Sequence, residues 1–183
     1  MTQTTSQQLG LFIKATQFAA DKHRNQRRKD ADASPYINHP IALANVLANE
    51  GGVEDPVVLC AAVLHDTIED TETTAVDLDA LFGGKVTSVV LEVTDDKSLE
   101  KDVRKQRQIE HAPHISPEAK LVKLADKICN LRDILASPPA VWSAERKQAY
   151  FDWAVQVVAG VRGVNPHLEA VFDGLCARRA ELS

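Results

Sequence analysis

The stretch 57–70 constrains this chain more than any other, because it joins an apolar run directly to a cluster of ionisable side chains. Residues 57–64 are apolar enough to be buried, and residues 65–70 read His-Asp-Thr-Ile-Glu-Asp. Burying an imidazole and three carboxylates is costly for folding unless their charges are compensated. On a helix, His65 shares a face with Glu69, and Asp66 with Asp70. The stretch therefore predicts a buried segment that holds a divalent cation.

Helical periodicity extends over nearly the whole chain, so we expect an all-α bundle. Periodicity alone also allows a buried strand at 57–64, but Asp55-Pro56 is a helix-start signal and strand patterns are nearly absent elsewhere. Similar start signals are Asn38, as an N-cap before Pro40, and Ser116-Pro117. The expected helices cover about 9–25, 39–50, 56–70, 75–82, 86–93, 117–137, 143–161 and 165–179, and residues 101–111 form a polar, strongly charged stretch.

Length and composition fit one domain over 1–183, with its core at about 9–175. The chain has 183 residues, of which 44% are hydrophobic and 26% charged, as in ordinary globular domains. A net charge of -5 argues against general nucleic-acid binding, and no apolar run reaches membrane-spanning length. Three widely spaced cysteines favour a reducing compartment. We therefore expect a cytoplasmic protein without nucleic-acid or membrane partners. The sequence leaves open whether it forms a homo-oligomer.

Four side chains from separate parts of the sequence are candidate metal ligands: His39, His65, Asp66 and Asp126. Asp126 lies opposite the leucine stripe of its expected helix. A mixed imidazole and carboxylate set suits a divalent ion such as Mn²⁺, with Zn²⁺, Fe²⁺, Ni²⁺ or Co²⁺ as alternatives. Taken singly, His39 is typical of an ordinary core or surface histidine, and Asp126 of a solvated helix aspartate. The combination is what favours a metal site.

Several motifs together resemble a known family. The chain is similar, over about 9–175, to the stand-alone (p)ppGpp hydrolases of the metazoan SpoT-homologue (Mesh1-like) type, a branch of the HD-domain phosphohydrolases. The motifs are residues 27–30 (Arg-Arg-Lys-Asp), 36–40 (Tyr-Ile-Asn-His-Pro), 65–70, 94–97 (Thr-Asp-Asp-Lys) and 120–127 (Lys-Leu-Val-Lys-Leu-Ala-Asp-Lys).

The resemblance implies an HD-domain helical bundle that holds Mn²⁺ and hydrolyses the 3′-pyrophosphate of ppGpp or pppGpp. The products are GDP or GTP plus pyrophosphate, which ends the stringent-response signal. The implied metal ligands are the four candidates above, and Glu69 with Asp70 is the implied water-handling pair. A substrate with several phosphates in a net-acidic protein also needs a local basic wall. The expected substrate-binding residues are Arg28, Lys29, Asn130, Lys101, Arg104 and Arg146, with Arg24, Lys97 and Lys123 also available for that wall.

Other interpretations remain open at this stage. The same site could remove the 2′-phosphate of NADPH, since that substrate also places a phosphate on a ribose hydroxyl beside a purine. A non-catalytic nucleotide-binding protein with a structural metal is a second alternative, and a helical interaction module is a third. Trp142 and Tyr150 could line a nucleotide pocket, although packing is the more common role. We expect His23, His111, His114 and His167 to lie at the surface.

Overall fold

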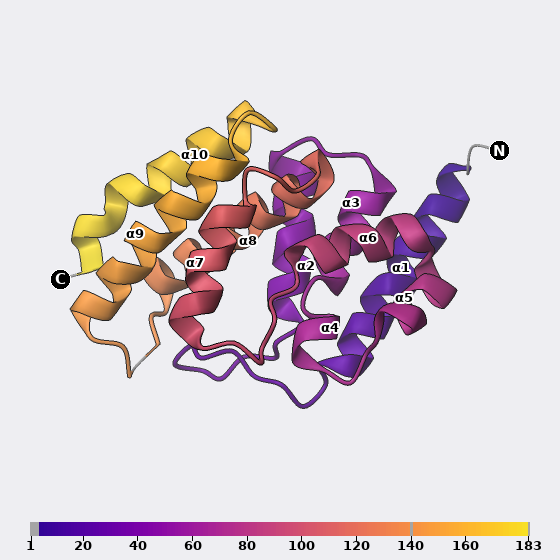
Figure 1. The fold of residues 1–183 in the computed structure, drawn as a ribbon, viewed down its shortest axis with the longest axis horizontal. Coiled ribbons are helices and arrows are strands. Elements are labelled where there is room, and N and C mark those ends of the chain that lie inside the picture. The colour runs from indigo at the N-terminus through magenta and orange to yellow at the C-terminus, as the bar shows by residue number, and fades with distance from the viewer. Residues whose placement is uncertain (1–3, 140, 183) are drawn as a thin grey trace.

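The computed structural model describes residues 4–139 and 141–182, and helices make up its regular structure (Figure 1). These residues contain an isolated bridge between Arg27 and Pro35 but no β-strand, which confirms the all-α prediction. None of their helices is long and apolar enough to cross a membrane. The α-helices are α1 (Thr5–Lys22), α2 (Asn38–Asn45), α3 (Pro56–Leu64), α4 (Thr67–Asp70), α5 (Ala75–Phe82), α6 (Gly84–Val93), α7 (Lys101–His111), α8 (Pro117–Ala136), α9 (Ala144–Val161) and α10 (Pro166–Ala177), with a π-helix, η1 (Val46–Glu50), after α2 and a 3-10 helix, η2 (Arg178–Leu182), after α10.

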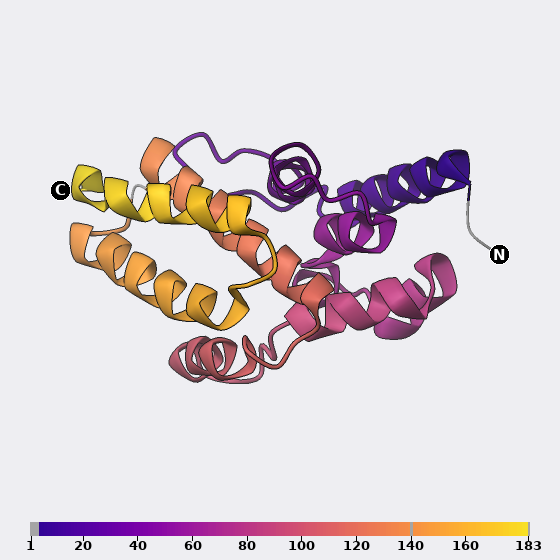
Figure 2. The ribbon, with the colours of Figure 1, turned by 90° about the horizontal axis from the view of Figure 1, so that it is seen from above.

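Helix α8 is the central element. It packs against α2, α3 and α6 on one side and against α9 and α10 on the other. Figure 2 shows it running between the N-terminal helices and the C-terminal pair. The helix can contact both groups because apolar side chains cover most of its circumference, and residues such as Leu124, Ile128 and Leu131 are fully buried. A polar group on α8 therefore lies close to both halves of the molecule.

Most predicted helix starts are confirmed, because polar side chains cap the free amide groups at helix N-termini. Asp55 accepts a hydrogen bond from the Val57 amide at 2.8 Å, so 57–64 is a helix and not a strand. Ser116 caps α8 through the Ala119 amide at 3.2 Å. The first helix starts earlier than predicted, since Thr4 forms a capping box with Gln7.

The prediction that Asn38 is an N-cap is wrong. Asn38 already lies inside the first turn of α2, and its side chain makes no capping hydrogen bond there. The reason is the turn that precedes the helix. The Asn38 amide donates to the Pro35 carbonyl at 3.1 Å, and the His39 amide donates to the Tyr36 carbonyl at 3.0 Å. The backbone therefore already forms a hydrogen-bonded turn before Pro40, and α2 begins at Asn38.

The prediction of one continuous helix over 56–70 is also wrong. Helix α3 ends at Leu64 and the short α4 begins at Thr67, so His65 and Asp66 lie in the connection between two helices. The backbone of Asp66 has φ -99° and ψ 0°, in the bridge region between helix and strand. The Thr67 hydroxyl donates to the Leu64 carbonyl at 2.7 Å and satisfies the end of α3. Because α3 and α4 are separate helices, the side chains of His65 and Asp66 do not have to share one helical face with those of Glu69 and Asp70.

Substituting Leu124 tests the central role of α8. The side chain is 0% exposed, so Leu124→Ala should lower the free energy of unfolding by about 2–5 kcal/mol through lost burial and an unfilled cavity. Leu91→Ala on α6 is the matched control, because its side chain is 47% exposed and the expected loss is below about 1 kcal/mol. Urea unfolding of both variants measures the difference. Equal losses would contradict the assignment of α8 as the core helix.

Candidate metal centre and active site

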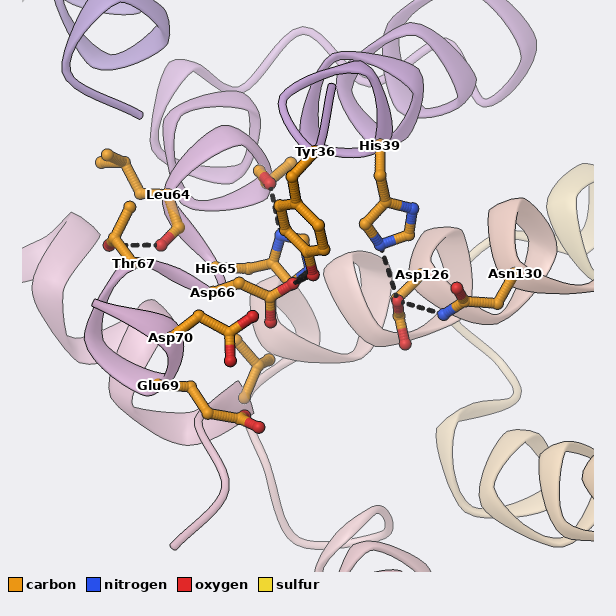
Figure 3. Close-up of polar contacts among 12 residues, drawn as sticks. Tyr36, His39, Leu64, His65, Asp66, Thr67, Glu69, Asp70, Asp126 and Asn130 are labelled. Atoms are coloured by element: carbon orange, nitrogen blue, oxygen red, sulfur yellow. Dashed lines mark hydrogen bonds and ion pairs between the residues drawn. The ribbon is translucent and has the colours of Figure 1, made fainter. Parts of the chain in front are cut away.

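Three of the predicted metal ligands, His39, His65 and Asp126, converge in the structure (Figure 3). One candidate ligand atom from each residue lies within 4.8 Å of the other two, and His39 Nε2 is 3.2 Å from Asp126 Oδ1. His39 belongs to the first turn of α2, His65 follows α3, and Asp126 lies on α8. Both histidines are buried. The cluster is therefore a candidate His/Asp metal site with largely buried donors.

The fourth predicted ligand, Asp66, lies beside this cluster. Its Oδ2 is 2.9 Å from His65 Nε2, and the Tyr36 hydroxyl donates to the same oxygen. Asp66 is not among the three residues whose ligand atoms all lie within 4.8 Å of one another. Although burial opposes ionisation, the charge of His65 and its hydrogen bond hold the pKa of Asp66 below its usual range. The carboxylate is thus available as an anion next to the three-residue group.

The two imidazoles lie in different surroundings, and these set their protonation in opposite directions. His65 Nδ1 is 2.9 Å from the Ala62 carbonyl oxygen, which only accepts, so Nδ1 carries a proton and Nε2 is directed into the site. Burial opposes the charged ring of His65, but the negative charges of Asp66 and Asp126 raise its pKa to about 9. Burial lowers the pKa of His39, which favours its neutral form.

A cation fits this set of donors. Within the described residues, His39 Nδ1 is buried without a hydrogen-bond partner, which is costly in a folded protein, and His65 Nε2 faces the Asp66 carboxylate at 2.9 Å. Two imidazoles with two carboxylates are a common ligand set for a transition-metal ion. A bound cation would occupy the place of the proton on His65 Nε2 and offset the charges of Asp66 and Asp126.

Asp126 is anchored by its own helix. Lys127 Nζ is 2.8 Å from Oδ2, while Asn130 Nδ2 donates to Oδ1 at 2.6 Å. Burial opposes ionisation of Asp126, but Lys127 and His39 together hold its pKa well below the usual range. Lys127 is itself buried and lies 4.2 Å from the centre of the Trp153 ring. These contacts fix the carboxylate in orientation and keep it anionic.

Glu69 and Asp70 have different surroundings although they are neighbours on α4. Glu69 Oε2 accepts the Asp95 amide at 3.0 Å, and its Oε1 is 4.0 Å from Arg104. Burial, followed by the nearby negative charges, raises the pKa of Glu69 to about 7. Asp70 instead accepts hydrogen bonds from Gln26 at 2.7 Å and from Lys97. Glu69 is therefore a carboxyl group that exchanges protons near neutral pH.

The site opens onto a cavity of about 520 Å³ with a basic lining. It includes the candidate metal ligands and Glu69. Asp70 lines a neighbouring cavity of about 280 Å³ instead. Arg24 pairs with Asp21 outside the cavity, and Lys97 pairs with Asp70. The cavity wall contains all six predicted substrate-binding side chains, Arg28, Lys29, Lys101, Arg104, Asn130 and Arg146.

A family model described as HD domain matches residues 15–155 of this chain. The chain belongs to the HD-domain family.

Relatives of this HD-domain protein include guanosine-3′,5′-bis(diphosphate) 3′-pyrophosphohydrolases named MESH1. The Danio rerio protein is 53% identical and the Homo sapiens protein 54% identical, each over 92% of this chain and 94% of the relative. A solved structure described as a metazoan orthologue of SpoT that hydrolyses ppGpp and plays a role in starvation responses matches with a TM-score of 0.91. It is 45% identical, and the match covers 99% of both chains.

Several residues in this HD-domain site were missed in the sequence. Tyr36 lies within a quoted motif, but only the structure shows its hydroxyl on Asp66. The prediction that His23 lies at the surface is wrong, because its exposed fraction is 2%. The available signal was that Ala15, Ala19 and His23 follow one another at intervals of four residues. Trp142 and Tyr150 line the cavity while also packing against the core.

The raised pKa of Glu69 predicts a pH-dependent cost to stability. In the unfolded chain the carboxyl ionises near pH 4.5, but the folded protein retains the proton up to about 7. The folded state binds more protons in this window, so stability falls as the pH rises through it. In metal-free protein, Glu69→Gln should raise the free energy of unfolding by the order of 2 kcal/mol at about pH 8, and by much less near pH 4.5.

Urea unfolding of both proteins across this pH range measures the difference. Glu54→Gln is the matched control, because Glu54 is exposed and the same substitution should change stability by less than about 0.5 kcal/mol. If the stability gained by Glu69→Gln does not increase with pH, burial does not perturb the pKa of this carboxyl group.

Proposed function

We propose that this chain is a metal-dependent hydrolase that removes the 3′-pyrophosphate of ppGpp or pppGpp. The products are GDP or GTP and pyrophosphate, and the reaction ends the stringent-response signal. One observation carries the proposal. The cluster of His39, His65 and Asp126 shares a basic cavity with Glu69, in a chain 54% identical to a human relative named for this reaction.

The proposed cofactor is Mn²⁺, held by His39, His65, Asp66 and Asp126. The donor chemistry supports it, since borderline-to-hard divalent ions accept imidazole nitrogen together with carboxylate oxygen. A bound divalent ion supplies Lewis-acid stabilisation of charge on a phosphoryl oxygen. The protein's part is to keep both carboxylates ionised and the His65 ring oriented. Lys127, Tyr36 and the Ala62 carbonyl provide the contacts for this.

Glu69 is the proposed proton acceptor for the attacking water, and Asp70 is its partner in the water-handling pair. A general base is most effective when its pKa lies near the working pH, and the pKa of Glu69 is about 7. Glu69 also lines the cavity that contains the metal cluster. It is held there by the Asp95 amide without being part of that cluster.

The basic residues of the cavity are the proposed substrate contacts. Arg28 and Lys29 lie in both cavities, and Arg28 donates to Asn130 at 3.1 Å. Arg146 lies over the Trp142 ring at 4.5 Å. Planar guanidinium and indole groups can stack on a purine, while ammonium groups attract phosphate. Lys101 and Arg104 supply further positive charge to the cavity wall.

We place the enzyme in the cytoplasm, where thiols remain reduced. All three cysteines are free, and Cys60 and Cys129 are buried. Burial raises the pKa of both thiols to about 12, so they are kept as unreactive packing groups.

The decisive assay measures pyrophosphate released from ppGpp by the purified protein with Mn²⁺. We expect GDP and pyrophosphate in equal amounts, with turnover lost on chelation and restored by added Mn²⁺. The same protein with NADPH tests the alternative substrate through release of inorganic phosphate. Turnover of NADPH without turnover of ppGpp would reject the proposed substrate, and turnover of neither would favour a binding protein.

Two substitutions separate the metal centre from the proposed base. His65→Ala should lose bound metal and activity together. Glu69→Gln should retain metal but lower kcat by about 10²–10⁴-fold, the usual contribution of general-base catalysis. Metal content and steady-state kinetics are measured on both. His114→Ala, at an exposed position, is the control and should leave both quantities unchanged. Full activity of Glu69→Gln would refute the assigned base.

A further inference from the structure

The Asp70 carboxylate accepts hydrogen bonds from two segments that are far apart in the sequence, one before it and one after it. Gln26, in the segment after α1, donates through Nε2 to Asp70 Oδ2 at 2.7 Å. Lys97, in the connection between α6 and α7, donates to Asp70 Oδ1. Only 17% of the Asp70 side chain is exposed. One donor on each oxygen fixes the plane of this carboxylate, and the ammonium group compensates its charge.

Gln26 is itself oriented by a buried histidine. His23 Nδ1 is 2.6 Å from Gln26 Oε1, which only accepts, so His23 donates this hydrogen bond. The amide nitrogen of Gln26 must then face Asp70. His23 is buried, and its ring packs 4.9 Å from that of Tyr36, which donates to Asp66. This side of the site is therefore a connected polar network that reaches from α1 to the metal cluster.

The connection 94–97 contacts both acidic residues of α4. Its Asp95 amide donates to Glu69 and its Lys97 donates to Asp70. Gln108 on α7 holds the connection in place by donating to Asp95 Oδ2 at 2.5 Å. The Thr-Asp-Asp-Lys motif thus orients the acidic pair, and its lysine does not line the main cavity.

We propose that Gln26 and Lys97 are positioning residues that fix Asp70 as an oriented, charge-compensated carboxylate, which leaves Glu69 to accept the proton. This inference rests on the proposed function. Asp70 would have to give up part of its contact with Gln26 or Lys97 to turn toward water. Glu69 lines the cavity, and the Asp95 amide binds its Oε2. Among the described residues its Oε1 has no close donor, because Arg104 is 4.0 Å away.

Gln26→Glu is the most specific variant. It keeps the size of the side chain and an oxygen for His23, but it replaces the donor to Asp70 with a carboxylate oxygen. We expect kcat for ppGpp to fall by about 10–100-fold, as is typical when a partner that orients a site residue is lost. KM should stay within about twofold, and metal content should not change. Gln17→Glu, the same change at an exposed position on α1, should leave kcat unchanged.

Lys97 is tested by a conservative pair of variants. Lys97→Met should lower kcat by a similar factor, while Lys97→Arg should recover most of the activity because it keeps the charge and the donors. A rise in KM with unchanged kcat would show instead that Lys97 binds substrate, which would overturn its role on Asp70.

A double-mutant cycle shows whether Gln26 acts through Asp70. In an Asp70→Asn background, adding Gln26→Glu should change the residual kcat by less than about twofold, because the carboxylate being oriented is already gone. Two independent, multiplying effects would overturn the inference. Full activity of the Gln26→Glu variant beside an active wild type would also overturn the inference, but it would leave the proposed function intact. A wild type that does not hydrolyse ppGpp would overturn both.

Discussion

The convergence of Asp126, His39 and His65 is the constraint on which the rest of the structure depends. It joins the central helix α8 to α2 and to the break between α3 and α4. Charged groups at this depth are tolerated only when they are paired. Lys127 and Asn130 anchor the aspartate, and Ala62 orients the His65 ring. The packing around α8 therefore also sets the geometry of the candidate metal site.

The same burial gives the site its chemistry. Two neighbouring carboxyl groups on one short helix experience different surroundings because different segments contact them. Glu69 receives one backbone amide and faces the cavity, whereas Asp70 is enclosed by Gln26 and Lys97. Burial raises the pKa of a carboxyl group when neighbouring groups do not fully compensate its charge. A raised pKa suits a proton acceptor, but it lowers the stability of the fold. The proposed role of Glu69 as a proton acceptor and the stability of the fold oppose each other for this reason.

Much of the fold could be predicted because its signals are local. Asp55 and Ser116 cap the helices that they were expected to cap, since a capping hydrogen bond spans only two or three residues. The errors arose where contacts beyond the local pattern decide. Asn38 is inside its helix because a preceding turn already winds the chain, and His23 is buried where its ring packs against that of Tyr36. The break at His65-Asp66 had no clear local signal.

The sequence by itself determined the helical class and the inventory of reactive groups, because periodicity and side-chain chemistry are properties of the residues alone. It also indicated the resemblance to HD-domain hydrolases that the comparisons confirm. Only the tertiary structure decided that His39, His65 and Asp126 meet, that Asp66 lies beside them, and that Glu69 and Asp70 face different cavities. The physical reason is that burial and charge pairing depend on segments distant in sequence, which come together only when the helices pack.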